Sequence, residues 1–337
     1  MLTIREKLAD KDNDYSHIEN ELAIKGINFT ERLESELKSL LSVSVIIPAY
    51  NLYDRLQLTL NSLSIQEGFS HDSLEVLVID DYSDILLYNN IQVPANLVVK
   101  FFRNKNNFGS GICRDIGLYH STGDISLFLD SDMVPSKYFL REHVIRHQFF
   151  DNLLLLGFKE NVELRDFANW NVREPDPKKD PRFYKETAKY GIANKKISLY
   201  LDTNRFKEFG NGKIMYEDSL PNGWSLPEAI ITHSLSIRRD NAITLGGFDS
   251  DFNKWGYEDS YFGAKCLAYR LFAVPLLSCA SYHIRHPRRR EEDKERVRGG
   301  NRDIYLSKIA KPLRIFTAGD FENEFYYYIK NSVEING

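Results

Sequence analysis

Cysteine is scarce in this chain, and the few cysteines present do not have the spacings that close disulfides or bind zinc. The 337 residues include three of them, Cys113, Cys266 and Cys279, with no C-x-x-C pair. A disulfide framework needs an even number, and a structural zinc site needs closely spaced pairs. The three are therefore expected to be small, buried, reduced thiols.

Long apolar runs and an excess of basic residues are also missing. The longest apolar runs, at 43–47 and 153–157, fall far short of the 18 or more residues of a membrane span. The first residues lack the apolar segment of a signal peptide. Lys and Arg number 44 against 48 Asp and Glu, a net charge of −4 that argues against a nucleic-acid partner. The protein is expected to be cytoplasmic or peripheral to a membrane, with no transmembrane segment.

The sequence does contain ample core material, because 42% of its residues are hydrophobic and 13% are aromatic. Short apolar runs alternate with helix-like segments in its central part. The runs predicted as strands lie at 43–48, 74–79, 98–102, 125–129, 231–237 and 272–277. Helices are predicted from Leu56 to Leu63, from 112 to 120 and through Phe262 to Tyr269. This alternation predicts an α/β fold with a mostly parallel sheet and helices on both faces.

The remaining segments have weaker patterns. Residues 160–225 are rich in Lys, Asn, Asp and Pro and are expected to form irregular loops and short helices. Residues 1–41 place Leu and Ile at loosely helical spacing, which predicts one or two helices before the main domain.

Acidic residues follow two of the predicted strands, at the edge where parallel sheets bind ligands. Asp80 and Asp81 end the second strand, and Asp130 and Asp132 end the fourth. Residues two apart share a face in an extended chain, so the D-x-D pair could bind one hard cation. A surface turn is the alternative, and the apolar strand before Asp130 favours the cation site. For Asp80 and Asp81 both interpretations stay open.

Two further groups have candidate chemistry. Glu258 and Asp259 stand at a predicted helix start, where the helix dipole favours acids. The alternative is that one of the two is a general base. His283 and His286 lie beside Arg285 in a stretch, 285–298, with seven basic and four acidic residues. A solvated helix is the default interpretation of such a stretch. Imidazole beside cations would also suit a metal-bound diphosphate.

Together these blocks resemble glycosyltransferase family 2, which has the nucleotide-sugar-binding GT-A fold. The motifs of the first block, 43–135, are Val45-Ile46-Ile47-Pro48-Ala49-Tyr50-Asn51, Asp80-Asp81-Tyr82-Ser83, Asn107-Phe108-Gly109, Arg114 with Gly117, Ser121-Thr122-Gly123-Asp124 and Asp130-Ser131-Asp132. The second block, 232–290, resembles the carboxyl-terminal block of β-1,4-galactosyltransferases, polypeptide N-acetylgalactosaminyltransferases and bacterial chondroitin polymerases. Its motifs are Gly246-Gly247-Phe248-Asp249, Trp255-Gly256-Tyr257-Glu258-Asp259 and Ile284-Arg285-His286.

The resemblance implies a role for each matching residue. Donor binding would fall to Pro48, Ala49, Tyr50, Asp81, Arg114, Asp130 and Ser131. Metal would be bound by Asp132 and His286, with His283 as a second candidate. Asp259 would be the catalytic base, and Trp255, Gly256 and Glu258 would face the acceptor. One departure is Asp115, which stands where the family commonly has asparagine.

The implied activity is inverting, metal-dependent transfer of a hexosyl or N-acetylhexosaminyl group from a UDP-sugar to an acceptor hydroxyl. The acceptor would be a glycan, a lipid-linked glycan, a peptide or a small molecule, and the metal Mn²⁺, with Mg²⁺ as the alternative. Residues 42–290 would form the GT-A domain, divided into a nucleotide-binding part (42–160) and an acceptor and metal-closing part (161–290). Helical extensions, 1–41 and 291–337, would serve acceptor docking or self-association rather than chemistry.

Two rival interpretations remain. A sugar-nucleotide synthesising enzyme on a similar sheet would need a glycine-rich, basic loop after the first strand, and residues 48–51 contain no glycine. A catalytically silent sugar-binding or scaffold subunit could retain the fold, although intact Asp132, Asp259 and His286 argue against it.

Overall fold

A mixed β-sheet is the centre of the computed structural model, which describes residues 1–9, 24, 32, 41–165, 173–180, 227, 230–252, 256–285 and 291–335. The described strands are β1 (Val43–Ala49), β2 (Leu74–Asp80), β3 (Val98–Asn104), β4 (Ile125–Leu129), β5 (Met133–Pro135), β6 (Leu153–Val162), β7 (Ser234–Arg238), β8 (Phe272–Ile284) and β9 (Ser332–Ile335). Their order in the sheet is β5-β8-β6-β7-β4-β1-β2-β3-β9. The longer described helices are α1 (Ile4–Ala9), α3 (Tyr53–Ser64), α4 (Ser110–His120), α5 (Phe139–His147), α8 (Arg239–Thr244), α9 (Glu258–Ala268), α10 (Glu291–Ile309) and α11 (Ala318–Lys330).

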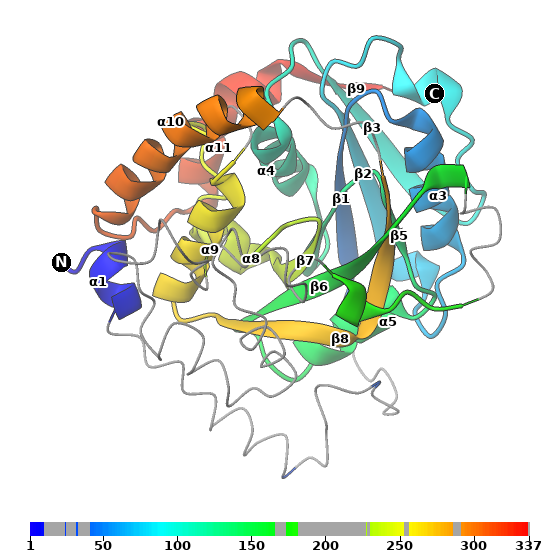
Figure 1. Cartoon of the computed structure of the whole chain (residues 1–337), viewed down its shortest axis with the longest axis horizontal. Helices are drawn as coiled ribbons and strands as arrows, with labels where there is room; N and C mark the ends of the chain where they lie inside the picture. The colour runs from blue at the N-terminus through cyan, green and yellow to red at the C-terminus, as the bar shows by residue number, and fades with distance from the viewer. Residues whose placement is uncertain are drawn as a thin grey trace.

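The parallel half of the sheet forms as the sequence predicts, because its strands are apolar on both faces. Strands β4, β1, β2 and β3 run parallel, and α3 and α4 lie on opposite sides of them (Figure 1). Along β1, Val45 and Ile47 belong to the cluster that includes Leu60 of α3, whereas Ile46 belongs to the cluster that includes Ile116 of α4. Each fully buried aliphatic side chain of this kind contributes about 1.5–3 kcal/mol.

The other half of the sheet is mixed, and two of its strands, β5 and β6, were not predicted. β7 pairs antiparallel with both β4 and β6, and β8 runs parallel to β6 and antiparallel to β5. β6 continues to Val162, into the stretch expected to be irregular, and β8 continues to Ile284 rather than ending at 277. The extra residues of the two strands pair with one another, Glu160 with Tyr282 and so on to the end. Several of these residues are polar, so a pattern of apolar residues does not predict that they form strands.

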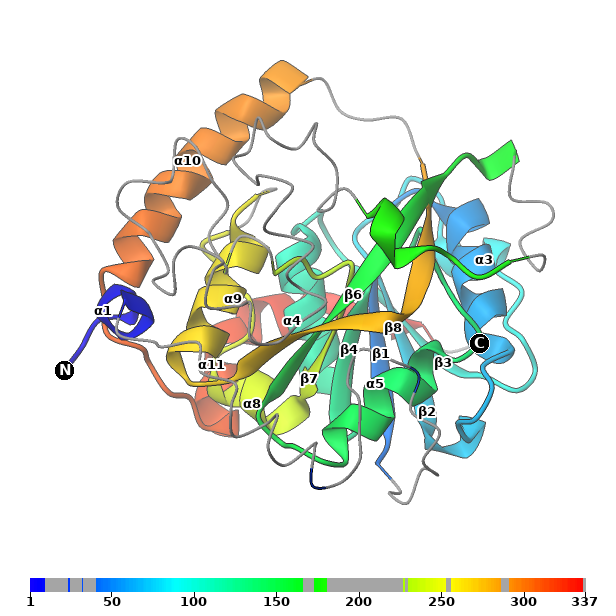
Figure 2. The same ribbon diagram turned by 60° about the horizontal axis from the view of Figure 1, so that its bottom comes forward.

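The terminal segments are integral to the fold. Ile4 of α1, Tyr305 of α10 and Phe321 of α11 all belong to the core cluster that covers α4 and α9. Residues 291–335 are largely helical, as expected, but they end in β9, a strand that was not predicted and that pairs antiparallel with β3. Figure 2 shows α10 along α9 and α1 beside its end. The described parts of both segments are therefore packed against the core, and their role in acceptor docking or self-association stays a prediction.

All three cysteines are buried, and no disulfide occurs among the described residues. Of the helices that the structure describes, none has the length and apolar character needed to cross a bilayer.

A buried histidine pair on α5 faces the middle of β7. Nδ1 of His143 lies 2.7 Å, and Nε2 of His147 2.9 Å, from the hydroxyl of Ser236. Burial lowers the pKa of His143 well below its usual range, and His147 and Arg146 add to the effect. Burial, together with Arg238, lowers the pKa of His147 to about 3. Both rings are therefore neutral in the folded protein at neutral pH.

The histidine pair should make stability fall on mild acidification. The unfolded chain takes up protons near pH 6.5 and the folded chain does not, so stability is lost as pH falls below that value. The loss is about 1.4 kcal/mol per pH unit for each histidine. Urea unfolding at pH 7 and pH 5 measures the change, and His147→Gln should remove about half of the histidine contribution. An unchanged pH dependence in that variant would contradict the assignment.

Candidate active site

The candidate donor-binding residues lie at the carboxyl ends of β1, β2 and β4. Pro48 and Ala49 are the last two residues of β1, and Tyr50 follows with 41% of its surface exposed. The amide of Asp81 donates to the carbonyl of Ala49 across the strand ends (2.9 Å). Because neighbouring parallel strands end together, the residues that follow them form one edge of the sheet.

The Asp81 carboxylate fixes the loop that leads into α4. It accepts hydrogen bonds from the amides of Phe108 (2.7 Å) and Gly109 (2.8 Å) and from the side chain of Asn104 (2.9 Å). Its neighbour Asp80 accepts from the amide of Ser83 and from an Arg103 guanidinium. A nucleoside would therefore meet Asp81 only at the acceptor positions that these donors leave.

Arg114 of α4 joins two of the predicted site residues. Its guanidinium lies 2.8 Å from Asp130 after β4 and 3.5 Å from Asp259 in the first turn of α9, while its own side chain is 5% exposed. Burial alone would lower the pKa of Arg114, but Asp259, Asp130 and Glu258 together raise it. A single fixed cation thus links the D-x-D turn to the candidate base.

The D-x-D triplet is a turn rather than an extended segment, so the prediction that both carboxylates share one face was wrong. The amide of Met133 donates back to the carbonyl of Asp130 (3.1 Å), which reverses the chain there. Asp130 contacts Arg114, whereas Asp132 lies 3.2 Å from Nε2 of His283 on β8. The two acids consequently have different partners, and Ser131 lies buried between them.

His283 reaches Asp132 because the unpredicted end of β8 runs beside the turn. The amide of Ile284 donates to the carbonyl of Asp132 (2.9 Å), and Met133 pairs with His283 in register. Nδ1 of His283 lies 2.8 Å from Oδ1 of Asn161, an atom that only accepts, so Nδ1 carries a proton. Nε2 is thereby directed at the Asp132 carboxylate.

The pair of donor atoms suits a divalent cation of the Mn²⁺ kind. A neutral imidazole nitrogen and a carboxylate oxygen are both ligands of such ions, and Asn161 orients the imidazole as an outer partner does in metal sites. Among the described residues, no group of three possible ligands gathers at one point. His286, the other metal candidate, and Trp255, an acceptor candidate, lie outside the described residues.

Glu258 and Asp259 begin α9 and differ in their surroundings. Asp259 accepts from the hydroxyl (2.5 Å) and amide (3.2 Å) of Thr232, whereas Glu258 is buried and accepts from the amide of Gly256 (2.6 Å). Burial raises the pKa of Glu258 to about 7, and Asp259 adds to the effect. Burial also raises the pKa of Asp259, while Arg114 and Thr232 counteract it.

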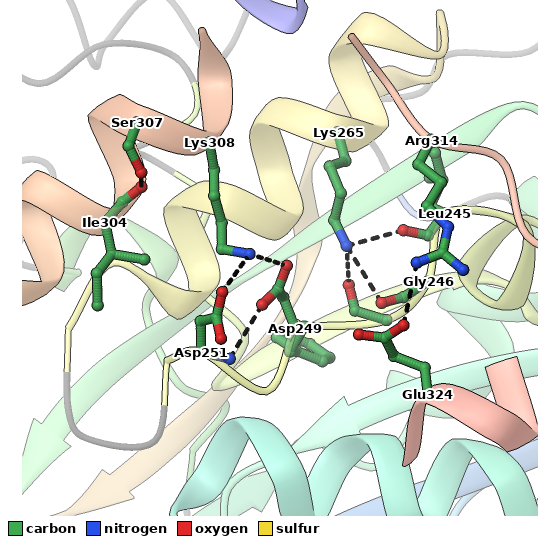
Figure 3. Close-up of polar contacts among 12 residues, drawn as sticks. Leu245, Gly246, Asp249, Asp251, Lys265, Ile304, Ser307, Lys308, Arg314 and Glu324 are labelled. Carbon is green, nitrogen blue, oxygen red and sulfur yellow. Dashed lines mark hydrogen bonds and ion pairs between the residues drawn. The ribbon is translucent and has the colours of Figure 1, made fainter. Parts of the chain in front are cut away.

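A buried Asp115 and Lys265 hold the glycine turn on the other side of Arg114. Both oxygens of Asp115 accept from the amide of Phe248 (2.9 and 3.1 Å), and Nζ of Lys265 donates to the carbonyls of 245, 246 and 247 (Figure 3). A Cβ atom on Gly247 would lie 1.9 Å from Asp115, and φ there is +53°, so glycine is required. The Phe248 ring then lies under Arg114, 5.4 Å away.

No role was predicted for Lys265, and Asp115 was noted only as a departure from the family. Asp115 accepts one amide with two oxygens, which an asparagine with its single acceptor oxygen would not do. The available signal was a lysine within a helix whose other faces are mainly small or apolar.

Comparison with known proteins agrees with this architecture. Residues 44–205 match the model of Glycosyl transferase family 2. The uncharacterized glycosyltransferase YfnE of Bacillus subtilis is 30% identical over 263 residues, which cover 73% of this chain and 66% of that protein. Chondroitin synthase of Pasteurella multocida is 25% identical over 318 residues, or 90% of this chain and 30% of the synthase.

The fold has a counterpart of known structure. Mannosyltransferase PcManGT from Pyrobaculum calidifontis, solved in complex with GDP-Man and Mn²⁺, aligns with a TM-score of 0.56 at 15% identity, covering 94% of this chain and 81% of that one. The chain belongs to glycosyltransferase family 2 and has the GT-A fold. It spans 66% of the Bacillus relative and less than a third of the chondroitin synthase.

Proposed function

We propose that this glycosyltransferase moves a hexosyl or N-acetylhexosaminyl group from a UDP-sugar to an acceptor hydroxyl, with inversion at the anomeric carbon. The observation that carries the proposal is the pair of Arg114 contacts, to Asp130 at 2.8 Å and to Asp259 at 3.5 Å. They bring the end of a donor-binding strand and a candidate base to the same buried cation. Residues 42–160 would hold the nucleotide, and 161–290 the acceptor.

Asp259 is proposed as the base that takes the acceptor's proton. Its side chain is 23% exposed, and Thr232 and Arg114 fix the orientation of the carboxylate. A base held in this way removes the proton as the hydroxyl attacks and needs no reorientation during the reaction. Glu258, Gly256 and Trp255 would lie on the acceptor side. Arg114 keeps the charge of Asp259 balanced before the proton arrives.

Asp132 and His283, with His286, are proposed to hold a divalent metal, Mn²⁺ or alternatively Mg²⁺. When bound, such an ion acts as a Lewis acid that stabilises the charge on the departing diphosphate. The chain contributes the orientation of the ligands, through the Asn161 contact to His283 and the backbone bond from Ile284 to Asp132.

The relatives support a nucleotide-sugar donor. Two of them are named chondroitin synthase and hyaluronan synthase, and the Pyrobaculum neighbour was solved with GDP-Man and Mn²⁺. The proposed UDP donor rests on the motif resemblance, and the neighbour makes GDP-mannose the competing possibility. Detection of released UDP or GDP by mass spectrometry, across UDP-sugars and GDP-mannose with and without Mn²⁺, tests the proposal. Release of neither nucleotide would favour a silent scaffold subunit.

UDP affinity is expected to fall sharply in EDTA and to recover with Mn²⁺. Asp132→Ala should reproduce the EDTA result in calorimetry, since it removes a metal ligand. Asn161→Ala removes only the acceptor for Nδ1 of His283 and should weaken Mn²⁺ binding about 10- to 100-fold. Asp72→Ala, an exposed acid before β2 at the opposite end of the strand, serves as the control and should change nothing. Equal UDP affinity with and without metal would refute the metal assignment.

A further inference from the structure

The segment that leads into Glu258 and Asp259 has an unfavourable backbone conformation at both of its described ends. Asp249 has φ of +81°, Gly256 +107° and Tyr257 +69°. For residues other than glycine, left-handed backbone of this kind costs about 1–2 kcal/mol and persists only where the surroundings hold it. Tyr257 stands directly before Glu258, so the way it is held affects the start of α9.

Lys308 of α10 holds the first end of this segment. Its ammonium lies 2.7 Å from Asp249 and 2.7 Å from Asp251, and Figure 3 shows the two carboxylates turned toward it from below α10. The amide of Asp251 also donates to Asp249 (3.0 Å). The Lys308 side chain is 16% exposed, so water screens its contact with Asp249 only in part.

Asn301 and Tyr305 of the same helix hold the second end. The Asn301 amide group donates to the carbonyl of Gly256 (2.8 Å), and the amide of Gly256 donates to Glu258 (2.6 Å). The ring of Tyr305, which is fully buried, lies 5.3 Å from the ring of Tyr257 at an interplanar angle of 31°. Asn301 is thus two hydrogen bonds away from the Glu258 carboxylate.

The three α10 residues share one face of the helix, since positions 301, 305 and 308 follow the helical spacing of four and three. That face contacts Asp249, Gly256 and Tyr257, all three positions with left-handed backbone at the ends of the segment. Apolar packing alone would need neither the amide of Asn301 nor the ammonium of Lys308. Both are directed at atoms of the segment itself.

We propose that α10 is a positioning element of the active site, in which Asn301, Tyr305 and Lys308 fix residues 249–252 and 256–257 and thereby orient Glu258 and Asp259 against Arg114. The inference rests on the proposed role of Asp259 as the base. It gives residues 301–308 an indirect role in the reaction, through the backbone that they hold, instead of a role in acceptor docking or self-association. None of these three residues is placed in contact with substrate.

The test compares Asn301→Ala and Lys308→Met with Ser307→Ala. Ser307 is the neighbouring exposed residue of α10, and its hydroxyl donates to the carbonyl of Ile304 in the same helix (2.8 Å). Hydrogen exchange of the amides between 248 and 259 should be faster in the first two variants and unchanged in Ser307→Ala. Lys308→Arg retains a cation for both carboxylates and should restore the wild-type exchange.

Turnover separates positioning from mere packing. Hydrolysis of the UDP-sugar that the wild type uses fastest should fall about 10²-fold in Asn301→Ala and Lys308→Met, the loss expected for a reacting group misplaced by about 1 Å. Calorimetric affinity for UDP with Mn²⁺ should stay at the wild-type value, because the donor edge of β1, β2 and β4 is untouched. Lys308→Arg should recover most of the turnover.

Two results would overturn the inference. One is hydrogen exchange over 248–259 that is no faster in Asn301→Ala and Lys308→Met than in Ser307→Ala. The other is a turnover per folded molecule that stays at the wild-type value in these two variants while only their melting temperature drops. A wild-type protein that neither binds UDP nor hydrolyses any UDP-sugar would instead refute the proposed function. The exchange comparison alone would then decide whether α10 fixes the segment.

Discussion

Asp259→Asn is expected to lower turnover by about 10²- to 10⁴-fold, the usual contribution of a positioned general base. The substitution is nearly isosteric, and asparagine still offers Oδ1 to the Thr232 hydroxyl, which lies 2.5 Å from it in the wild type. What it removes is the basic oxygen and the charge that faces Arg114 at 3.5 Å. UDP affinity should stay nearly unchanged, because the proposed donor contacts lie on other elements. Turnover and calorimetric UDP affinity, measured on the same preparation, test both statements.

Glu258→Gln is the matched control, since it changes the adjacent acid in the same helical turn. Burial raises the pKa of Glu258 to about 7, so glutamine resembles a form that the wild type already populates at neutral pH. If this side chain binds acceptor hydroxyls, the substitution should raise the acceptor KM more than it lowers kcat.

Helix capping is the competing explanation for both acids. It predicts a lower melting temperature in either variant, with activity per folded molecule preserved. An Asp259→Asn enzyme with wild-type turnover would eliminate the proposed base. Measuring the melting temperature and kcat together therefore separates the two explanations.

The parallel half of the sheet could be predicted because its strands are apolar runs in the sequence. β1, β2 and β4 are buried on both faces, so they are nearly continuous apolar runs, and acids follow the apolar parts of β2 and β4. β5, β6, β9 and the end of β8 were not predicted. Their residues are in strands because of partners far away in the sequence, such as Phe102 for Glu334 and Tyr282 for Glu160.

The candidate site shows the same division between residue type and geometry. The acids and the arginine could be identified, but the partner of each could not. Asp130 and Asp132 have separate partners because the chain turns between them, and Asn161 reaches His283 only through the pairing of β6 with β8. Asp115 and Lys265 are buried ionisable groups, which a sequence pattern assigns to the surface unless their partners are known.

Arg114→Met is expected to cause a loss of activity that depends on pH. The substitution roughly keeps the volume of the side chain but leaves Asp130, Glu258 and Asp259 without the cation that now lies among them. Arg114 lowers the pKa of both Glu258 and Asp259, so its removal should raise the pKa of each further. The proposed base would then be protonated in a larger fraction of the molecules than in the wild type. Arg114→Lys, which retains the charge without the forked geometry, should show a smaller loss.

The sign of both pH effects follows from that change. A base with a raised pKa moves the acid limb of the kcat profile to higher pH, so the loss should be greatest near pH 6 and partly relieved near pH 9.

A carboxyl whose pKa is raised by folding binds its proton more tightly in the folded state, so the variant's stability should decrease as pH rises from about 4 toward the raised value. Removing one partner of a buried ion pair costs about 3–5 kcal/mol, and the 36% exposure of Asp130 places the expected cost at the low end, about 3 kcal/mol. Urea unfolding and kcat profiles from pH 5 to 9 measure both effects. An acid limb that stays at its wild-type position would show that Arg114 does not control the charge of the Glu258 and Asp259 pair.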